Sequence, residues 1–250
     1  MIELVQLVKR FGSLVAVRDL TLTVPRGEFF AILGPNAAGK TTTIRVLTGL
    51  VKPTSGRARV AGFDIQTEPI QARRRLAYVP DFPFLYDKLT PWEFFRFTGQ
   101  LFDMEENLLR QRAHHLACRF HLEPYLHLPS DSLSHGTRQR VAIVSALVHQ
   151  PEVFVLDEPM VGLDPQHARI LKDILKEESQ RGVTIFISTH QLSVAEEMAD
   201  RIGIMNEGRL VAVGTRDELR RLSGADGALE QSFLALTGGG RPVGAGEGSP

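Results

Sequence analysis

The sequence predicts an α/β fold in which parallel strands carry polar groups at their ends. Two short apolar segments, 153–156 and 184–187, each end in polar residues, which is typical of buried parallel strands. A helical pattern at 165–180 lies between them, so the three segments predict a βαβ unit. Near the N-terminus, a glycine-containing loop at 34–41 follows a strand pattern and opens a helical one.

The remaining elements follow in chain order from apolar runs and turn residues. The N-terminal part reads as short strands separated by Gly- and Pro-containing turns. Strand patterns then give way to helical ones, with Pro91 suited to a first helical turn. A late hairpin is expected around Gly208. The strands are expected at 2–8, 15–24, 28–33, 57–64, 202–205 and 209–213, and the first helix at 39–51.

These elements predict a core built from two stretches of the chain. Residues 1–84 and 151–222 are expected to form it, because both carry strand patterns. The helical residues 85–150 would then be an inserted subdomain. A C-terminal helix is expected at 223–237, and the Gly- and Pro-rich residues 238–250 are expected to be a disordered tail.

Composition excludes several classes of function. The chain has 250 residues, with 29 Lys and Arg against 29 Asp and Glu, so no basic field indicates a nucleic-acid partner. Cys118 is the only cysteine, which excludes a disulfide framework and a Cys-rich zinc site. We expect no signal peptide, and the longest apolar stretches, such as 141–148, are far shorter than the ~18–20 residues that span a bilayer. The chain is therefore expected to reach a membrane only through a partner.

The glycine-containing loop matches a phosphate-binding motif. Residues 34–41 read Gly-Pro-Asn-Ala-Ala-Gly-Lys-Thr, the pattern of a loop whose backbone N–H groups face nucleotide phosphates. The helix that follows adds the positive end of its dipole. Lys40 would reach the β- and γ-phosphates, and the Thr41 hydroxyl would bind Mg²⁺. The alternative is a chance match in a glycine-rich turn, which the flanking strand and helix patterns disfavour.

A second chemical element follows the strand pattern at 153–156. Asp157 could hold Mg²⁺, directly or through water, and Glu158 could polarise an attacking water. Adjacent carboxylates at the end of a buried strand are costly unless a cation neutralises them, although they could also be two exposed acids. His190 follows the neighbouring strand pattern, at the edge where ligands bind in open α/β sheets, although a lone histidine is more often structural.

Together these residues resemble the ATP-binding subunits of ABC (ATP-binding cassette) transporters, over roughly residues 2–237. The most diagnostic stretch is 133–140, Leu-Ser-His-Gly-Thr-Arg-Gln-Arg, which is similar to the family's Leu-Ser-Gly-Gly-Gln signature. Ser134 and Gly136 at a helix N-terminus would form a second anion site, although by themselves they could be an ordinary helix cap. The resemblance implies a P-loop NTPase core of the RecA-like type, with an antiparallel β subdomain and an inserted α-helical subdomain.

The resemblance also implies a function and a site. The chain would be an ATPase that powers a membrane transporter, with ATP and Mg²⁺ as cofactors. Each ATP would lie between the phosphate loop of one subunit and the signature of another, in a head-to-tail homodimer or heterodimer. The catalytic residues would be Glu158, His190 and Lys40, and the metal ligands Thr41, Asp157 and Asp81. The nucleotide contacts would be Phe11, Ala16, Asn36, Ala37, Ala38, Gly39, Lys40, Thr41, Thr42, Asp81, Ser134, Gly136 and Asp164.

Three departures from the family pattern bear on that site. Ala37 stands where the family commonly has glycine, and alanine adopts positive φ only at a cost. His135 and Thr137 replace Gly and Gln in the signature. Asp81 stands where the family usually has Gln, and a carboxylate accepts hydrogen bonds but donates none. Asp81 could therefore hold a metal-bound water, but it could not donate to a phosphate.

An aromatic segment at 82–97 indicates a protein partner. It holds seven of the chain's aromatic residues, which are 14 Phe, 3 Tyr and 1 Trp in all. In the family this region receives a separate multi-span permease, and we expect Phe82, Phe84 and Tyr86 to be contact residues, whereas the other aromatics would fill the helical core. Residues 83–90 are most similar to exporter-type ATPases that move drugs, lipids or polysaccharides. Such a subunit would be cytoplasmic, on the inner face of the cell membrane.

Two other functions stay open from the sequence. A single cassette without a permease also fits a soluble ABC ATPase of the Fe–S assembly or repair type, although the chain has no long coiled-coil insertion. An unrelated P-loop kinase or GTPase is the other alternative. The chain lacks an Asn-Lys-x-Asp guanine-reading element, however, and the signature region has no place in a kinase.

Overall fold

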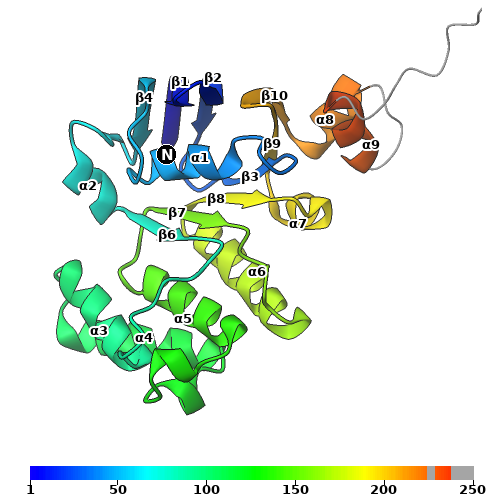
Figure 1. Ribbon diagram of the computed structural model, residues 1–250. Helices are drawn as coiled ribbons and strands as arrows, with labels where there is room; N and C mark the ends of the chain where they lie inside the picture. The colour runs from blue at the N-terminus through cyan, green and yellow to red at the C-terminus, as the bar shows by residue number, and fades with distance from the viewer. Residues whose placement is uncertain (224–228, 238–250) are drawn as a thin grey trace, which may run out of the picture.

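The computed structural model describes residues 1–223 and 229–237, and within them the strands form two sheets (Figure 1). One sheet has six strands in the order β10-β9-β3-β8-β7-β6, and the other has four in the order β2-β1-β4-β5. The strands are β1 (Ile2–Phe11), β2 (Leu14–Val24), β3 (Phe29–Leu33), β4 (Ser55–Val60), β5 (Phe63–Asp64), β6 (Leu76–Val79), β7 (Val153–Asp157), β8 (Thr184–Thr189), β9 (Arg201–Asn206) and β10 (Arg209–Gly214). The helices are α1 (Lys40–Leu47), α2 (Pro69–Arg74), α3 (Pro91–Leu101), α4 (Glu106–Arg119), α5 (His135–Val148), α6 (Pro165–Gln180), α7 (Leu192–Met198), α8 (Arg216–Ser223) and α9 (Leu229–Leu236), with short 3₁₀ turns at Glu123–Tyr125 and Ser130–Ser132.

The six-stranded sheet is the parallel core of the molecule. β3 pairs in parallel with β8 and β9, and β7 pairs in parallel with β6 and β8, whereas β10 is an antiparallel edge strand. Every residue of β3, β7 and β8 is buried, as expected for strands covered on both faces. Because these strands run in the same direction, their carboxyl ends meet at one edge of the sheet.

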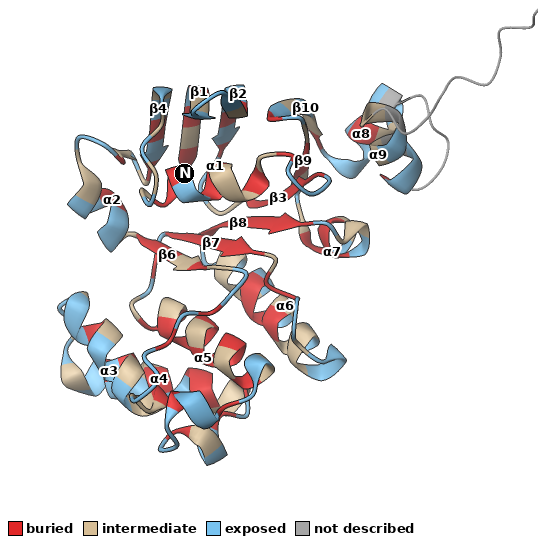
Figure 2. Ribbon diagram, in the orientation of Figure 1, coloured by how far each residue is buried: buried red, intermediate tan, exposed pale blue. Residues whose placement is uncertain are grey.

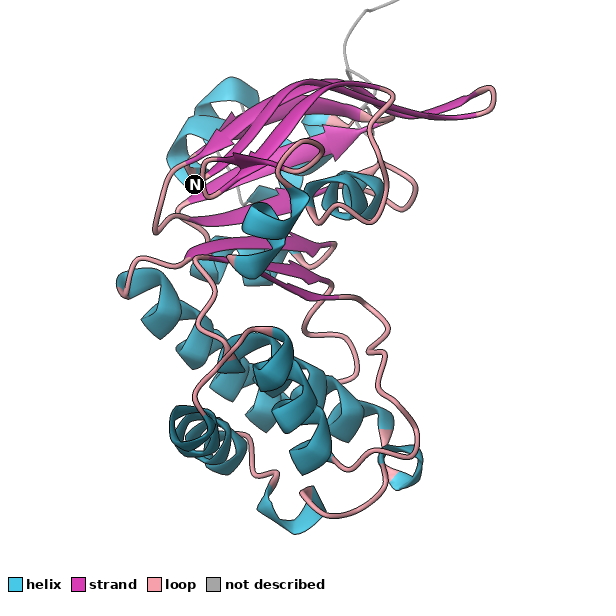
Figure 3. Cartoon of the chain, turned by 90° about the vertical axis from the view of Figure 1, so that its left-hand side faces the viewer, coloured by secondary structure: helices cyan, strands magenta, loops and turns pink. Residues whose placement is uncertain are grey.

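The four-stranded sheet is antiparallel and lies beside the core sheet, in the upper half of Figure 3. Along β2, Leu20, Leu22 and Val24 are buried and alternate with exposed residues, so one face of the strand is apolar. These side chains belong to the same buried cluster as Phe30 and Phe186 of the core sheet, whose rings stack with centroids 5.5 Å apart. This sheet is the antiparallel β subdomain.

Helices α3, α4 and α5 form the helical subdomain, below the sheets in Figures 1 and 3. α3 begins at a capping box, in which the Glu93 N–H donates to Thr90 Oγ1 at 3.2 Å and the Thr90 N–H donates to Glu93 Oε2 at 2.9 Å. Gly99 lets α3 approach α4, because a Cβ there would lie 2.6 Å from Leu109 Cδ2. Figure 2 shows the buried residues of this subdomain gathered where its helices face one another.

The predicted fold class is confirmed, and the differences lie in short elements. Sequence reasoning missed β6, α2, α7 and α8, and the first three are too short to show a clear period. The single strand expected at 57–64 is two strands, β4 and β5, separated by a turn in which Ala61 and Gly62 have φ of 50° and 87°. α9 falls within the helix expected at 223–237, whereas the expected tail at 238–250 lies outside the described residues. None of the helices in the described ranges is long and apolar enough to cross a membrane.

Candidate active site

The loops at the carboxyl edge of the parallel sheet hold the predicted catalytic residues. β3 leads into the loop 34–39, β6 leads to Asp81, β7 ends at Asp157 and β8 leads to His190. The strand register places Asp157 opposite Ser188. Parallel pairing therefore brings together side chains that are far apart in the sequence.

Close backbone packing holds the phosphate loop in shape. Gly39 has φ +104°, and a Cβ at this position would lie 2.5 Å from Ala16 O, so only glycine fits. From the other side, the Gly208 N–H donates to Ala38 O at 2.9 Å. Ala37 has φ 63°, a left-handed conformation that costs a residue with a side chain about 1–2 kcal/mol. The strain expected where alanine replaces the family's glycine is therefore present.

Lys40 is the buried cation of the site. It is the first residue of α1 and is 7% exposed. Its Nζ donates to Gly34 O at 2.6 Å and to Pro35 O at 3.2 Å. Burial lowers the pKa of Lys40, whereas the charges of Glu158 and Asp157 raise it. A bound phosphate would offer this ammonium stronger, charged acceptors than the two carbonyls.

Asp157 is a buried carboxylate that fits a cation. It is 1% exposed, and its Oδ1 accepts from Ser188 Oγ. Its Oδ2 is also buried and has no hydrogen-bond partner within the described part of the chain. Burial raises the pKa of Asp157, hydrogen bonding from the Ser188 and Thr41 hydroxyls lowers it in part, and the charges of Asp81 and Glu158 raise it. A metal ion at Oδ2 would offset this cost, and a carboxylate with the Thr41 hydroxyl is a donor set that Mg²⁺ accepts. The residues present therefore fit the predicted ion.

Glu158 and His190 form a pair next to Asp157. His190 Nδ1 lies 2.9 Å from Glu158 Oε1, with the Glu158 side chain 18% exposed and the His190 side chain 56% exposed. The backbone of Glu158 has φ 48°, and its N–H donates to Ser188 O at 3.0 Å. Backbone strain of this kind is concentrated at active sites. The geometry suits a general base whose carboxylate is oriented by a neighbouring imidazole.

A cavity of about 540 Å³ is lined by Lys40, Asp157 and Glu158, whereas His190 is not among its lining residues in the described chain. Predicted site residues that line it are Ala16, Asn36, Ala37, Ala38, Gly39, Lys40, Thr41, Thr42, Asp81, Asp157 and Glu158. Sequence reasoning missed the lining residues Leu14, Val15, Arg18, Glu207 and Gly208. The turn at 206–208 was visible in the sequence. Its contact with the phosphate loop exists only because β9 pairs beside β3.

Phe11, which the resemblance assigns to the adenine, is not among the cavity's lining residues in the described chain. It is the last residue of β1 and is 49% exposed, and Lys9 Nζ lies 4.7 Å from its ring centroid. Leu14 and Val15, at the start of β2, supply apolar lining instead. A contact between Phe11 and the nucleotide stays a prediction.

The signature residues form a second surface. Ser134 is the N-cap of α5 and Asp164 is the N-cap of α6, and both are exposed. The two helix starts are packed together, since a Cβ at Gly136 would lie 2.7 Å from Gly162 O. Among the described residues, Ser134, Gly136 and Asp164 do not line the cavity. One chain therefore carries two separate candidate surfaces for phosphate.

A phosphate loop after a buried strand, with two acids at the end of another parallel strand of the same sheet, defines the chain as a P-loop nucleotide hydrolase. The family model described as ABC transporter matches residues 17–161, more than half of the chain. The chain belongs to the ABC transporter family, as an ATP-binding cassette with the ATPase fold of that family.

Relatives agree with this assignment. The probable multidrug ABC transporter ATP-binding protein YbhF of Escherichia coli (strain K12) is 35% identical over 94% of this chain, which spans only 41% of YbhF. The daunorubicin/doxorubicin resistance ATP-binding protein DrrA of Streptomyces peucetius is 37% identical over 90% of this chain and 68% of its own length.

Solved structures give the same result. An ATP-binding subunit of an ABC transporter superposes with a TM-score of 0.91 at 34% identity, covering 94% of this chain and 99% of that one. The cassette MJ0796, solved as a dimer in a post-hydrolysis state bound to ADP and Pi, has a TM-score of 0.79 at 26% identity, covering 86% of this chain and 98% of its own. The match therefore extends over nearly the whole length of both solved cassettes.

Proposed function

We propose that this chain is the ATP-hydrolysing subunit of a membrane exporter, held on the cytoplasmic face of the cell membrane by a separate permease. The observation that carries the proposal is the meeting of the phosphate loop with Asp157, Glu158 and His190 at one sheet edge. Export is supported by the names of YbhF and DrrA, which refer to multidrug transport and to daunorubicin/doxorubicin resistance.

Hydrolysis would use Lys40 and Glu158, which line the cavity, and His190, which pairs with Glu158. Lys40 would exchange the carbonyls of its own loop for phosphate oxygens, and the N–H groups of residues 36–41 would bind the remaining oxygens. Glu158 would accept a proton from the water that attacks the γ-phosphate, while His190 orients the carboxylate from 2.9 Å. Loss of the Glu158 charge should therefore stop turnover and spare ATP binding.

We assign a Mg²⁺ site to Thr41 and Asp157, with Asp81 in reach of a water on the ion. When bound, the ion would neutralise phosphate charge. The support is the buried Oδ2 of Asp157, which has no hydrogen-bond partner among the described residues, and the presence of Thr41, Asp157 and Asp81 in the lining of one cavity. Asp81 is exposed and accepts hydrogen bonds only, which suits a water ligand better than a phosphate.

Two cassettes would complete each ATP site. Ser134 and Gly136 lie at the start of α5, a 14-residue helix whose dipole favours an anion at this end. Because this surface is separate from the cavity of its own chain, it would serve the ATP held by a partner cassette arranged head to tail. The partner would be a second copy of this chain or a related ATPase. The dimeric structure of MJ0796 supports this arrangement.

Phe82, Phe84 and Tyr86 would form the permease-binding surface. They are 76%, 71% and 47% exposed, which is unusual for aromatic side chains without a partner. The Phe84 and Tyr86 rings meet edge to face, with centroids 5.5 Å apart. Phe95, in contrast, is fully buried in the helical subdomain, where it serves as core. The exposed trio follows Asp81 directly, so a permease bound here would contact the chain next to the cavity.

The test is an affinity purification of the Glu158→Gln variant, with ATP, from detergent-extracted membranes of its own cells. A multi-span membrane protein should co-purify. Adding Phe84→Ser should remove that protein, whereas Ile70→Ser, which changes an apolar side chain on α2 that is 67% exposed, should retain it. Recovery of soluble partners alone would contradict the transport proposal and favour a soluble ABC ATPase.

A further inference from the structure

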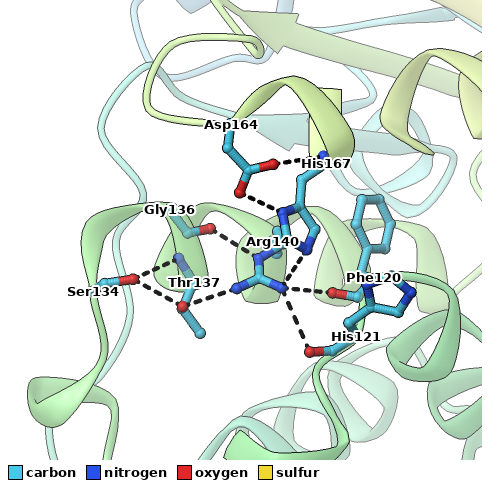
Figure 4. A network of polar contacts seen from close by, with 8 residues as sticks. All are labelled: Phe120, His121, Ser134, Gly136, Thr137, Arg140, Asp164 and His167. Atoms are coloured by element: carbon cyan, nitrogen blue, oxygen red, sulfur yellow. Dashed lines mark hydrogen bonds and ion pairs between the residues drawn. The ribbon is translucent and has the colours of Figure 1, made fainter. Parts of the chain in front are cut away.

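We propose that Arg140 and His167 are positioning residues that hold Ser134 and Asp164 in one fixed geometry for ATP-dependent dimerisation. This inference rests on the proposed function. Figure 4 shows the contacts that carry it, which run from Ser134 through Thr137, Arg140 and His167 to Asp164. The two ends of this network are the N-caps of α5 and α6.

Arg140 is the fixed centre of the network. It is 7% exposed, and its guanidinium donates to Phe120 O at 2.7 Å, to Thr137 Oγ1 at 3.0 Å and to Gly136 O at 3.3 Å. These acceptors come from the end of α4 and from the first turn of α5. A guanidinium stays charged and needs several acceptors when buried, so Arg140 has little freedom to move.

His167 joins Arg140 to Asp164. Arg140 Nη1 lies 2.8 Å from His167 Nε2, and His167 Nδ1 lies 2.6 Å from Asp164 Oδ2. Because a guanidinium can only donate, Nε2 must accept, and Nδ1 must carry the proton that goes to Asp164. His167 is therefore the neutral imidazole in this network, with its side chain only 14% exposed. Hydrogen bonds from the backbone and side chain of His167 also hold the pKa of Asp164 below its usual range.

Thr137 connects the network to the signature cap. Its Oγ1 lies 2.9 Å from Ser134 Oγ and accepts from Arg140 Nη2 at 3.0 Å, and its N–H donates to Ser134 Oγ at 3.3 Å. This is one of the positions at which the sequence departs from the family's Gln. The Thr137 hydroxyl at this position contacts both the Ser134 hydroxyl and the Arg140 guanidinium.

The two ends of the network face solvent while its middle is buried. Ser134 and Asp164 are exposed, and both are among the residues expected to contact nucleotide. Side chains that are mobile in the free subunit lose conformational entropy when they bind. The network orders both caps before binding, so it should favour dimerisation without contacting the chain's own nucleotide.

The proposal is tested by sedimentation of variants in the Glu158→Gln background, with and without ATP. His167→Leu should weaken the ATP-dependent dimer at least about tenfold, which is about 1.4 kcal/mol. His167→Gln can accept from Arg140 and donate to Asp164, so it should dimerise like the parent. ADP binding to the monomer should be equal in all variants. His114→Leu, which changes an exposed side chain on α4, is the matched control and should also behave like the parent.

The outcomes distinguish failure of the positioning role from failure of the proposed function. Equal dimerisation of His167→Leu and the parent would overturn the proposal, and so would an equal loss in the Leu and Gln variants. If the parent itself fails to dimerise with ATP, the proposed function is wrong instead. If the Leu variant does not fold, Thr137→Val decides, because valine lacks the hydroxyl that contacts both Arg140 and Ser134. Its ATP-dependent dimer should also weaken at least about tenfold, and dimerisation equal to the parent would overturn the proposal.

Discussion

Burial of His149 should make the folded chain sensitive to acid. His149 is the C-cap of α5, and its ring stacks on Phe102 with centroids 3.6 Å apart and an interplanar angle of 12°. Burial lowers the pKa of His149 to about 4 from an ordinary value of 6.5. The folded chain thus keeps this imidazole neutral at pH values where the unfolded chain protonates it.

The sign and size of the effect follow from proton linkage. Between about pH 6.5 and about pH 4 the unfolded state binds one more proton than the folded state, so stability falls as the pH falls through this window. At about 1.36 kcal/mol per pH unit, the free energy of unfolding should fall by about 2 kcal/mol between about pH 6.5 and about pH 5.

His149→Leu should remove this loss. The free energy of unfolding in urea should be measured near pH 7 and near pH 5 for the wild-type chain and for His149→Leu. Its decrease between the two pH values should be smaller in the variant by about 2 kcal/mol. The cost of losing the ring stack is the same at both pH values and drops out of the difference. His114→Leu, at an exposed position, should leave the wild-type difference unchanged. An unchanged difference in His149→Leu would refute the reasoning from burial.

Three further substitutions test the phosphate loop and its surroundings. Ala37→Gly should stabilise the fold by about 0.5–1 kcal/mol, because relief of the left-handed strain exceeds the entropy cost of glycine, and lower stability in urea unfolding would contradict this. Gly39→Ala should lower the free energy of unfolding by more than about 2 kcal/mol and abolish ATP binding, because the new Cβ would lie 2.5 Å from Ala16 O. Wild-type ATP affinity in a fluorescence titration would contradict this. Asp81→Asn should change the stimulation of ATPase activity by the permease more than it changes ATP affinity, since Asp81 is exposed and adjoins Phe82. A large loss of ATP affinity would instead show that Asp81 contacts the nucleotide or its metal ion directly.

Much of the site could be predicted because its residues follow strands directly. Lys40 and Thr41 lie after β3, Asp157 and Glu158 lie at the end of β7, and His190 follows β8. Apolar runs that end in polar residues mark such strands, and parallel pairing then brings their ends to one edge. The pairing of Glu158 with His190 at 2.9 Å is a consequence of β7 and β8 being neighbours.

Contacts between distant surface elements could not be predicted in this way. Glu207 and Gly208 line the cavity because β9 pairs beside β3, which no local pattern states. Arg140 and His167 lie on different helices, and each alone reads as an ordinary surface residue. Phe82 and Phe95 are equally aromatic in sequence, yet one is 76% exposed and the other is fully buried. Periodicity predicts elements, but which face each element covers depends on tertiary packing.

The central claim is that one cavity binds ATP and that Glu158 acts there as the base. Phosphate release and ATP affinity should be measured for the wild-type chain, for Glu158→Gln, and for Glu152→Gln as a control whose side chain is 48% exposed before β7. The rate of ATP hydrolysis should fall by a factor of about 10²–10⁴ in Glu158→Gln, which should keep its ATP affinity, while Glu152→Gln should hydrolyse ATP at the wild-type rate. Hydrolysis by Glu158→Gln at the wild-type rate would contradict the account.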